Sequence, residues 1–203
     1  AKAEKMDGVL RVFTAKDIPA ERFTGLIISD WPLMVREGET TRYLGDILAG
    51  VVAETEKQAR EALDSIDVEY EILTPVTDAS EALSDQSPKI HESGNLLSTT
   101  EIQRGDCIKA EKESDYVTKG TYKTQRIEHA FMELECCVAK PQEDGIEVFS
   151  QGQGVYEDRN SISKILGIPL ENVVVSLMPN GGAFGGKEDI SVQGHASLFA
   201  HLL

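Results

Sequence analysis

The sequence predicts an α+β fold in which strands and helices are mixed along the chain. Segments with apolar side chains at every second position, as in a half-buried strand, alternate with segments whose apolar side chains recur at helical spacing. Glycine, proline, asparagine and aspartate residues, which favour turns, separate these segments. With 203 residues, 40% of them hydrophobic, the chain can form one large domain or two small ones around a core.

The first part of the chain has the pattern of two strands on either side of a helix. Thr55 is a residue type that caps helix N-termini, and the helix it would begin has a stripe of apolar residues. The segment IDVEYEIL that follows alternates with period two. Together these features favour a crossover unit, which is right-handed where its strands are parallel. We expect strands at residues 9–14, 46–54 and 66–73, and helices at residues 56–65 and 78–83.

After residue 83 the chain becomes polar and rich in turn-forming residues, as a linker does. Regular patterns then return. Gly167 and Pro169 mark the end of one predicted helix, because glycine commonly follows the last helical residue and proline cannot continue a helix. We expect helices at residues 106–113, 156–166 and from about 188 to 203, and strands at residues 116–122, 133–139, 147–150 and 172–178.

The charge balance argues against several classes of partner. The chain carries 35 Asp and Glu against 20 Lys and Arg, a formal net charge of −15. Such an acidic surface repels the phosphates of nucleic acids. No apolar stretch approaches the roughly 18 residues of a membrane span, and no apolar signal segment opens the sequence. We therefore expect a cytoplasmic protein that binds neither nucleic acid nor membrane.

The cysteines do not form a disulfide framework or a metal-binding motif. There are three of them, two adjacent at Cys136 and Cys137, and no Cys-x-x-Cys spacing occurs. The sequence therefore lacks the ligand pattern of a zinc ribbon or an iron–sulfur cluster. Electron carriers, where the chemistry needs them, would lie on other domains or other polypeptides.

The most informative segment is PNGGAFGGKED, residues 179–189, which we call the glycine loop. Its glycines can adopt positive φ and let backbone N–H groups approach a ligand, and the helix N-terminus predicted there favours an anion. Residues 181–187 also fit the phosphate-loop spacing G-x-x-x-x-G-K, but Glu188 stands where Ser or Thr would hold Mg²⁺. Nucleotide binding is therefore disfavoured, and a tight connection without a ligand remains an alternative.

Two further segments hold polar residues that could serve a site. In SQGQG (residues 150–154) the amide of Gln151 could face a ligand, although a polar turn is the simpler interpretation. In IEHAFMELE, residues His129, Glu133 and Glu135 would share one face of an extended chain. A metal site is conceivable there, but a buried, hydrogen-bonded histidine is the simpler interpretation, and we expect no direct metal ligand in this sequence.

Five motifs, in this order, resemble the molybdenum-cofactor subunit of the xanthine dehydrogenase/aldehyde oxidase family of molybdenum hydroxylases. They are GDILAGVVAETEKQAREALDSIDVEYE, IEHAFMELE, VFSQGQG, LGIPLENVVV and GGAFGGKED. QGQG with GGAFGGKED is similar to the bacterial selenium-dependent xanthine dehydrogenases, which implies labile selenium beside a molybdopterin-type molybdenum cofactor. The resemblance implies a hammerhead-type domain without its first strands at residues 1–83, a linker at 84–114, and the opening part of a molybdopterin-binding domain at 115–203.

The resemblance also implies roles for single residues. Gln151 matches a glutamine beside the oxo group of the metal, and Gly182, Phe184 and Gly185 match a loop that packs against the cofactor. Glu188 matches a glutamate that positions purine substrates, where aldehyde oxidases commonly carry an apolar residue. The general-base glutamate of the family would lie beyond Leu203, so no catalytic residue is expected within this sequence.

The implied reaction is the hydroxylation of a carbon next to a ring nitrogen in a purine-like or xanthine-like N-heterocycle, with water as the oxygen source. Electrons would leave through iron–sulfur clusters and FAD on other domains or subunits. We expect the sequence to be a fragment of a longer enzyme and to be inactive by itself. The alternative from another class is a free-standing module that binds a small anion or a protein partner without catalysis.

Overall fold

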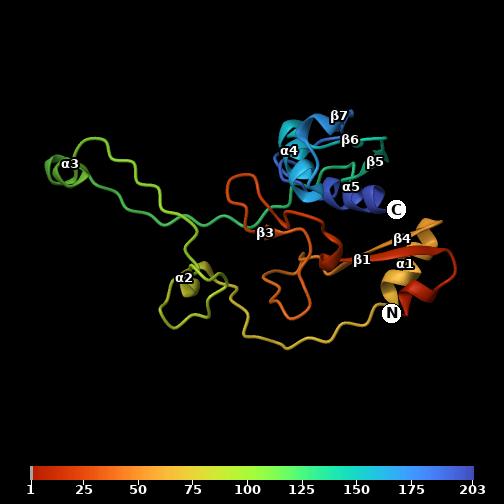
Figure 1. Ribbon diagram of the computed structural model, residues 1–203. Coiled ribbons are helices and arrows are strands. Elements are labelled where there is room, and N and C mark those ends of the chain that lie inside the picture. The colour runs from red at the N-terminus through yellow and green to blue at the C-terminus, as the bar shows by residue number, and fades with distance from the viewer. Residues whose placement is uncertain (1) are drawn as a thin grey trace. The chain divides into compact units, whose positions relative to one another are not determined.

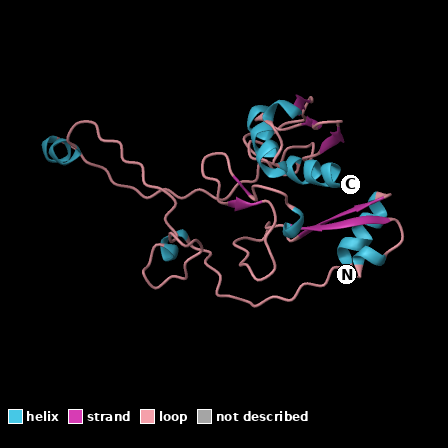
Figure 2. Ribbon diagram, in the orientation of Figure 1, coloured by secondary structure: helices cyan, strands magenta, loops and turns pink. Residues whose placement is uncertain are grey.

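The computed structural model describes residues 2–203, which divide into two units. One unit holds the described residues up to Val68 together with Glu128–Leu203, and the other holds Glu69–Ile127. Figure 1 follows the course of the chain, and Figure 2 shows its helices and strands. Among the described residues, no helix combines the length and the apolar character that crossing a membrane requires.

The first unit begins with a two-stranded antiparallel sheet, drawn in magenta in Figure 2. It pairs β1 (Val9–Thr14) with β4 (Ala49–Ala53), and α1 (Glu56–Asp64) follows. The Thr55 hydroxyl accepts a hydrogen bond from the Gln58 N–H at 3.3 Å, so the predicted cap is confirmed. The predicted crossover is wrong, because residues 66–73 form no strand in the structure. Alternation indicates which side chains share a face but does not provide a partner strand, and Ile72 is 91% exposed.

A three-stranded sheet in the order β5-β6-β7 forms the second half of this unit (Figure 1). Strand β5 (Cys137–Pro141) runs antiparallel to β6 (Ile146–Ser150), and β6 runs parallel to β7 (Val173–Leu177). Helix α4 (Val155–Leu166) joins the two parallel strands and ends, as predicted, at Gly167, whose φ is 67°.

The last helix, α5 (Gln193–Leu202), begins later than the sequence predicts. The Gln193 side-chain oxygen accepts hydrogen bonds from the N–H groups of Ser191 and Val192, each at 3.1 Å. Residues 188–192 are therefore held in a bent segment before the helix, which hydropathy alone does not reveal.

The core of this unit joins residues from both ends of the sequence. Phe13 on β1 stacks on Phe199 of α5 with ring centroids 4.6 Å apart, and the Arg11 guanidinium donates to the Leu202 carbonyl oxygen at 3.0 Å. Buried core residues come from β1, β6, β7, α4, α5 and the segments between them: Phe13, Ala15, Leu33, Met34, Ile146, Val148, Ile162, Ile165, Leu166, Val173, Ile190 and Leu198.

The second unit, Glu69–Ile127, has two short helices. These are α2 (Ala79–Ala82) and α3 (Cys107–Glu113), close to the predicted ranges, and the side chains of Asp78 and Asp106 cap their N-termini. The strand expected at residues 116–122 is absent from the structure, because this extended chain has no strand beside it. No residue of the unit is buried, so it has no hydrophobic core of its own.

The remaining elements are short. They are η1 (Ala3–Lys5), η2 (Ala15–Asp17), β2 (Phe23–Thr24), β3 (Trp31–Pro32) and η3 (Leu170–Asn172).

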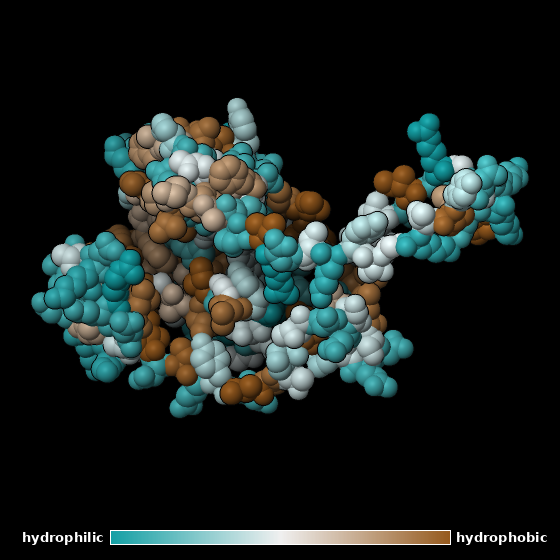
Figure 3. Space-filling view, turned by 180° about the vertical axis from the view of Figure 1, so that it is seen from behind, coloured by the Kyte–Doolittle hydropathy of each residue, from teal (hydrophilic) through white to brown (hydrophobic). Residues whose placement is uncertain are grey.

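Many large apolar side chains are exposed, including Ile27, Leu44 and Phe184. Figure 3 shows apolar areas on one face of the molecule.

Candidate functional site

The candidate site lies where two turns meet at the ends of β6 and β7. Strand β6 leads into residues 151–154, which we call the QGQG turn, and β7 leads into the glycine loop. Because the two strands are parallel neighbours, both turns leave the same edge of the sheet. The Met178 N–H donates to the Ser150 carbonyl oxygen at 2.8 Å, and the Asn180 side-chain amide donates to the Gln151 carbonyl oxygen at 3.2 Å.

Gln153 holds the glycine loop in place. Its side-chain oxygen accepts hydrogen bonds from the backbone N–H groups of Gly185 at 3.1 Å and Lys187 at 3.3 Å. Its own backbone N–H donates to the Lys187 carbonyl oxygen at 2.8 Å. The second glutamine of the QGQG turn is therefore a structural partner of the loop, a role that the sequence analysis did not assign.

Gln151 presents an unsatisfied polar atom at this junction. Its amide nitrogen donates to Glu133 Oε1 at 2.8 Å. Its amide oxygen is buried and, within the described residues, has no hydrogen-bond partner. Buried polar atoms are normally hydrogen-bonded, so an unpaired oxygen here is typical of a position that a ligand or water completes.

The backbone of the glycine loop is sharply turned. Gly182, Phe184 and Gly185 all have positive φ, at 102°, 54° and 88°. Phenylalanine rarely adopts this conformation, and the side chain of Phe184 is 75% exposed. Strained backbone of this kind clusters at functional sites, so the loop geometry supports a binding role.

Lys187 points into the protein. It is 2% exposed, its ammonium group donates to the Glu133 backbone carbonyl oxygen at 2.8 Å, and it lies 4.5 Å from the centre of the Phe131 ring. A phosphate-binding loop needs its lysine directed at the phosphates. The side-chain geometry therefore argues, together with Glu188, against nucleotide binding.

Glu188 has different neighbours from Gln151. Its side chain belongs to an exposed residue at the end of the glycine loop. It lines a shallow depression with Gly25, Leu26, Glu157 and Asp158, and its backbone carbonyl oxygen would lie 3.5 Å from a Cβ atom on Gly154 of the QGQG turn. The structure thus brings Gln151, Gly182 and Gly185 into one cluster of turns and places Glu188 at its margin.

Behind the QGQG turn lies a buried polar network. The Ser150 hydroxyl donates to Asp158 Oδ2 at 3.0 Å and accepts from the Gly152 N–H and from the Gln193 amide, each at 3.0 Å. A Cβ atom on Gly152 would lie 2.8 Å from the Asp158 carboxylate, so only glycine fits there. Burial raises the pKa of Asp158 to about 6, although the Ser150 hydroxyl partly opposes the shift.

This raised pKa predicts a pH-dependent stability. In the folded state Asp158 holds its proton up to about pH 6, whereas the ordinary pKa is 3.8. Because the folded state binds more protons in this window, the free energy of unfolding falls by about 3 kcal/mol as the pH rises from about 4 to 6. Asp158→Asn should remove this part of the pH dependence in urea unfolding of residues 1–203. Asp144→Asn, an exposed control, should not, and equal slopes for both variants would contradict the prediction.

The residues considered for a metal site have separate partners. Glu133 binds Gln151, the Glu135 carboxylate accepts from the Ser191 hydroxyl at 2.6 Å, and His129 lies 3.7 Å from Glu128. In the described part of the chain, no group of three His, Cys, Asp or Glu side chains is arranged to hold a metal ion.

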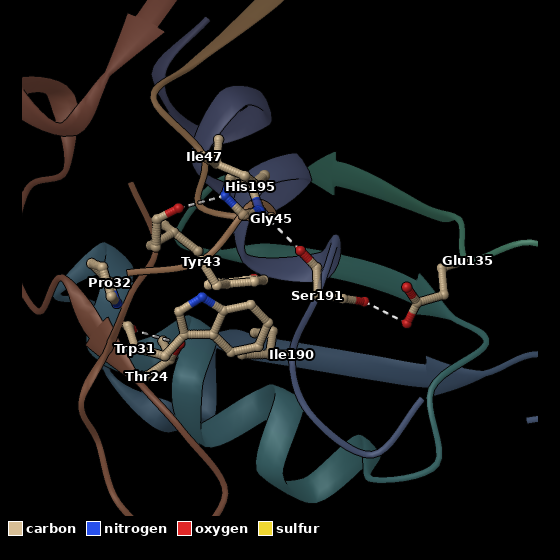
Figure 4. A pocket seen from close by; sticks show the side chains of 11 residues that line it. Thr24, Trp31, Pro32, Tyr43, Gly45, Ile47, Glu135, Ile190, Ser191 and His195 are labelled. Carbon is tan, nitrogen blue, oxygen red and sulfur yellow. Dashed lines mark hydrogen bonds between the residues drawn. The ribbon is translucent and has the colours of Figure 1, made fainter. Parts of the chain in front are cut away.

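A separate cavity of about 250 Å³ lies elsewhere in the first unit (Figure 4). Trp31 and Tyr43 line it in an edge-to-face arrangement, and His195 closes it, with its two ring nitrogens 3.0 Å from the Ser191 and 2.7 Å from the Leu33 carbonyl oxygens. Burial lowers the pKa of His195. Glu135, considered above for a metal site, lines this cavity, whereas Gln151, Gly182, Phe184, Gly185 and Glu188 do not.

Two family models together match nearly the whole chain. Residues 90–203 match the model described as a molybdopterin cofactor-binding domain. Residues 1–74 match the hammerhead domain of aldehyde oxidase and xanthine dehydrogenase. The chain belongs to the aldehyde oxidase/xanthine dehydrogenase family. The family models thus confirm the hammerhead-type domain followed by the start of a molybdopterin-binding domain, and the boundaries at residues 83 and 115 stay predictions.

Curated relatives in this family are longer proteins. A probable xanthine dehydrogenase subunit of Bacillus subtilis is 38% identical over 98% of the chain, which spans 27% of that protein. The large molybdopterin subunit of nicotinate dehydrogenase from Eubacterium barkeri is 36% identical over 99% of the chain, which spans 47% of it.

Solved structures of the family share the fold. The aldehyde oxidoreductase of Desulfovibrio gigas matches 98% of the chain and 23% of its own length, with a TM-score of 0.89 at 24% identity. Quinoline 2-oxidoreductase of Pseudomonas putida 86 matches 98% of the chain and 27% of its own length, with a TM-score of 0.83 at 25% identity.

Several residues that build the site are not evident from the sequence. The sequence suggests only a metal-ligand role for Glu133, and no role for Gln153, Ser150, Asp158 or Gln193. A signal for Gln153 was present, since it shares the glycine-flanked turn with Gln151. The others become visible only when distant segments are brought together.

Proposed function

We propose that this chain forms part of the molybdenum site of an enzyme that hydroxylates a carbon next to a ring nitrogen, with water as the oxygen source. The observation that carries the proposal is the buried, unpaired amide oxygen of Gln151 beside the glycine loop. A purine-like or xanthine-like substrate is supported by Glu188 and by relatives named for xanthine, nicotinate and quinoline, all N-heterocycles.

The residues present fit a molybdopterin-type cofactor. Gln151 can still donate one amide N–H and accept at one oxygen, which suits a polar group at the metal. Gly182 and Gly185 carry no side chain, so a ligand can approach the loop backbone closely. When bound, the cofactor supplies the oxygen-transfer chemistry and accepts the two electrons of the oxidation.

The residues of this chain bind the cofactor and orient the substrate. In this proposal Gln151 hydrogen-bonds to the cofactor, Gly182, Phe184 and Gly185 pack against it, and Glu188 accepts a hydrogen bond from an N–H of the heterocycle. The general base, the iron–sulfur clusters and FAD lie outside these residues, and labile selenium would be a ligand of the metal. The three free cysteines favour a cytoplasmic location.

Substitution of Glu188 tests the substrate role. Glu188→Gln in the natural-length enzyme should lower kcat/KM for a purine substrate by about 5- to 10-fold, because a charged hydrogen bond is replaced by a neutral one that contributes about 1–1.5 kcal/mol less. Asp189→Asn, the neighbouring control, should change it less than about threefold. Equal effects of the two substitutions would count against a substrate contact for Glu188.

The decisive experiment is the molybdenum-to-protein ratio of the natural-length protein purified from its own host. We expect a ratio near one, with oxidation of xanthine or nicotinate in preference to an aldehyde. Residues 1–203 expressed alone should bind no molybdenum cofactor stoichiometrically and show no activity. A ratio near zero, in a host that loads other molybdenum enzymes, would favour a module that binds a small anion without catalysis.

A further inference from the structure

We propose that Glu133 is the positioning residue that fixes the orientation of the Gln151 amide, an inference that rests on the proposed function. Glu133 precedes β5 and lies outside the two turns that carry the predicted site residues. No sequence motif assigns it this role, because its partners are 18 and 48 residues away along the chain.

Three parts of the site meet on Glu133. Its Oε1 accepts from the Gln151 amide at 2.8 Å, and its Oε2 accepts a hydrogen bond from the Gly181 N–H. Its backbone carbonyl oxygen accepts from the Lys187 ammonium at 2.8 Å. The QGQG turn and both ends of the GGAFGGK segment are therefore tied to one residue.

The close approach of Glu133 depends on Gly181. A Cβ atom at Gly181 would lie 2.8 Å from the Glu133 Cβ and 3.1 Å from its Oε2. No side chain can fit between the two residues. Gly181, the first glycine of the loop, therefore allows this contact in addition to giving the loop backbone its conformational freedom. The carboxylate and the glycine form one structural unit.

The chemistry of the contact requires a carboxylate. Gln151 Nε2 and Gly181 N are both donors, and an ionised carboxylate offers two acceptor oxygens and no donor. It therefore forces Gln151 to present its nitrogen to Glu133 and its oxygen to the unpaired, buried position. A glutamine at residue 133 has one acceptor oxygen and one donor NH₂ group. Its NH₂ group would therefore face the donor of either Gln151 or Gly181, and the Gln151 amide could rotate by 180° to exchange its oxygen and nitrogen.

The test uses the natural-length enzyme loaded with its cofactor. Glu133→Gln should retain molybdenum and lower kcat by about 10- to 100-fold, with KM changed less than about threefold. Its Mo(V) electron paramagnetic resonance signal should shift in the same direction as that of Gln151→Ala. In the Gln151→Ala background the Glu133→Gln substitution should have no further effect, because it acts through Gln151.

Glu135→Gln is the matched control. This nearby carboxylate accepts from the Ser191 hydroxyl, and a glutamine oxygen can accept the same hydrogen bond, so activity and signal should stay unchanged. Additive effects of Glu133→Gln and Gln151→Ala, or an unshifted Mo(V) signal, would overturn the proposal. If Glu133→Gln fails to fold, Glu133→Asp is measured instead. Because aspartate keeps two acceptor oxygens, its Mo(V) signal should match that of the wild type, and a signal shifted like that of Gln151→Ala would overturn the proposal. An inactive, molybdenum-free wild type would instead refute the proposed function.

Discussion

Replacing Gln151 with alanine is expected to lower kcat of the natural-length enzyme by about 100- to 1000-fold while molybdenum stays bound. Removing one preorganised hydrogen-bonding group beside the reacting atoms has effects of this size. The amide of Gln151 is held from one side by Glu133 at 2.8 Å and leaves its oxygen unpaired, so alanine removes the group without leaving a new clash. The measurements are steady-state kinetics and the molybdenum content of the purified variant.

Gln142→Ala is the control for this prediction. Gln142 lies on the exposed turn between β5 and β6 and donates to Glu147 at 3.1 Å, away from the candidate site. Its removal should leave kcat within about twofold, since isolated surface contacts contribute little. If both alanine variants kept full activity, Gln151 would have no role in the reaction.

Replacing Phe13 with alanine is expected to destabilise the fold by about 3–5 kcal/mol, the range for a large aromatic side chain removed from a core. Phe13 is fully buried and stacks on Phe199 of α5 at 4.6 Å. The hammerhead-like and molybdopterin-binding parts of the first unit share this contact. The loss should therefore destabilise both parts together in urea unfolding of residues 1–203.

Leu10→Ala on the same strand provides the comparison. Leu10 is 57% exposed, so its truncation should cost less than about 1 kcal/mol. Two separate unfolding transitions in the Phe13→Ala protein, one of them unchanged from the wild type, would show that the two parts fold independently. That result would contradict the shared core.

Local patterns predicted many of the elements that depend on nearby residues. Thr55, Asp78 and Asp106 cap helices in the structure as their residue types indicate, and Gly167 ends α4. These features follow from contacts within a few residues, which a sequence displays directly. The five motifs also indicated the family to which the chain belongs, and the family models confirm it.

Strand pairing and the hydrogen bonds of the candidate site could be identified only from the folded chain. Residues 66–73 and 116–122 are predicted to be strands from their local patterns, yet no segment pairs with them in the structure, because a strand is completed by a partner that can lie anywhere in the sequence.

Local sequence patterns are sufficient to predict the mixed α+β class and the glycine loop, and to make Gln151 a candidate site residue. The folded chain was needed to show that Glu133 joins Gln151 to Gly181, that Lys187 faces inward, and that Asp158 is buried behind the QGQG turn. Hydrogen bonds and burial depend on distance in space, which a sequence does not display. Glu133 and Gly181 are 48 residues apart along the chain, and only the sheet brings them together.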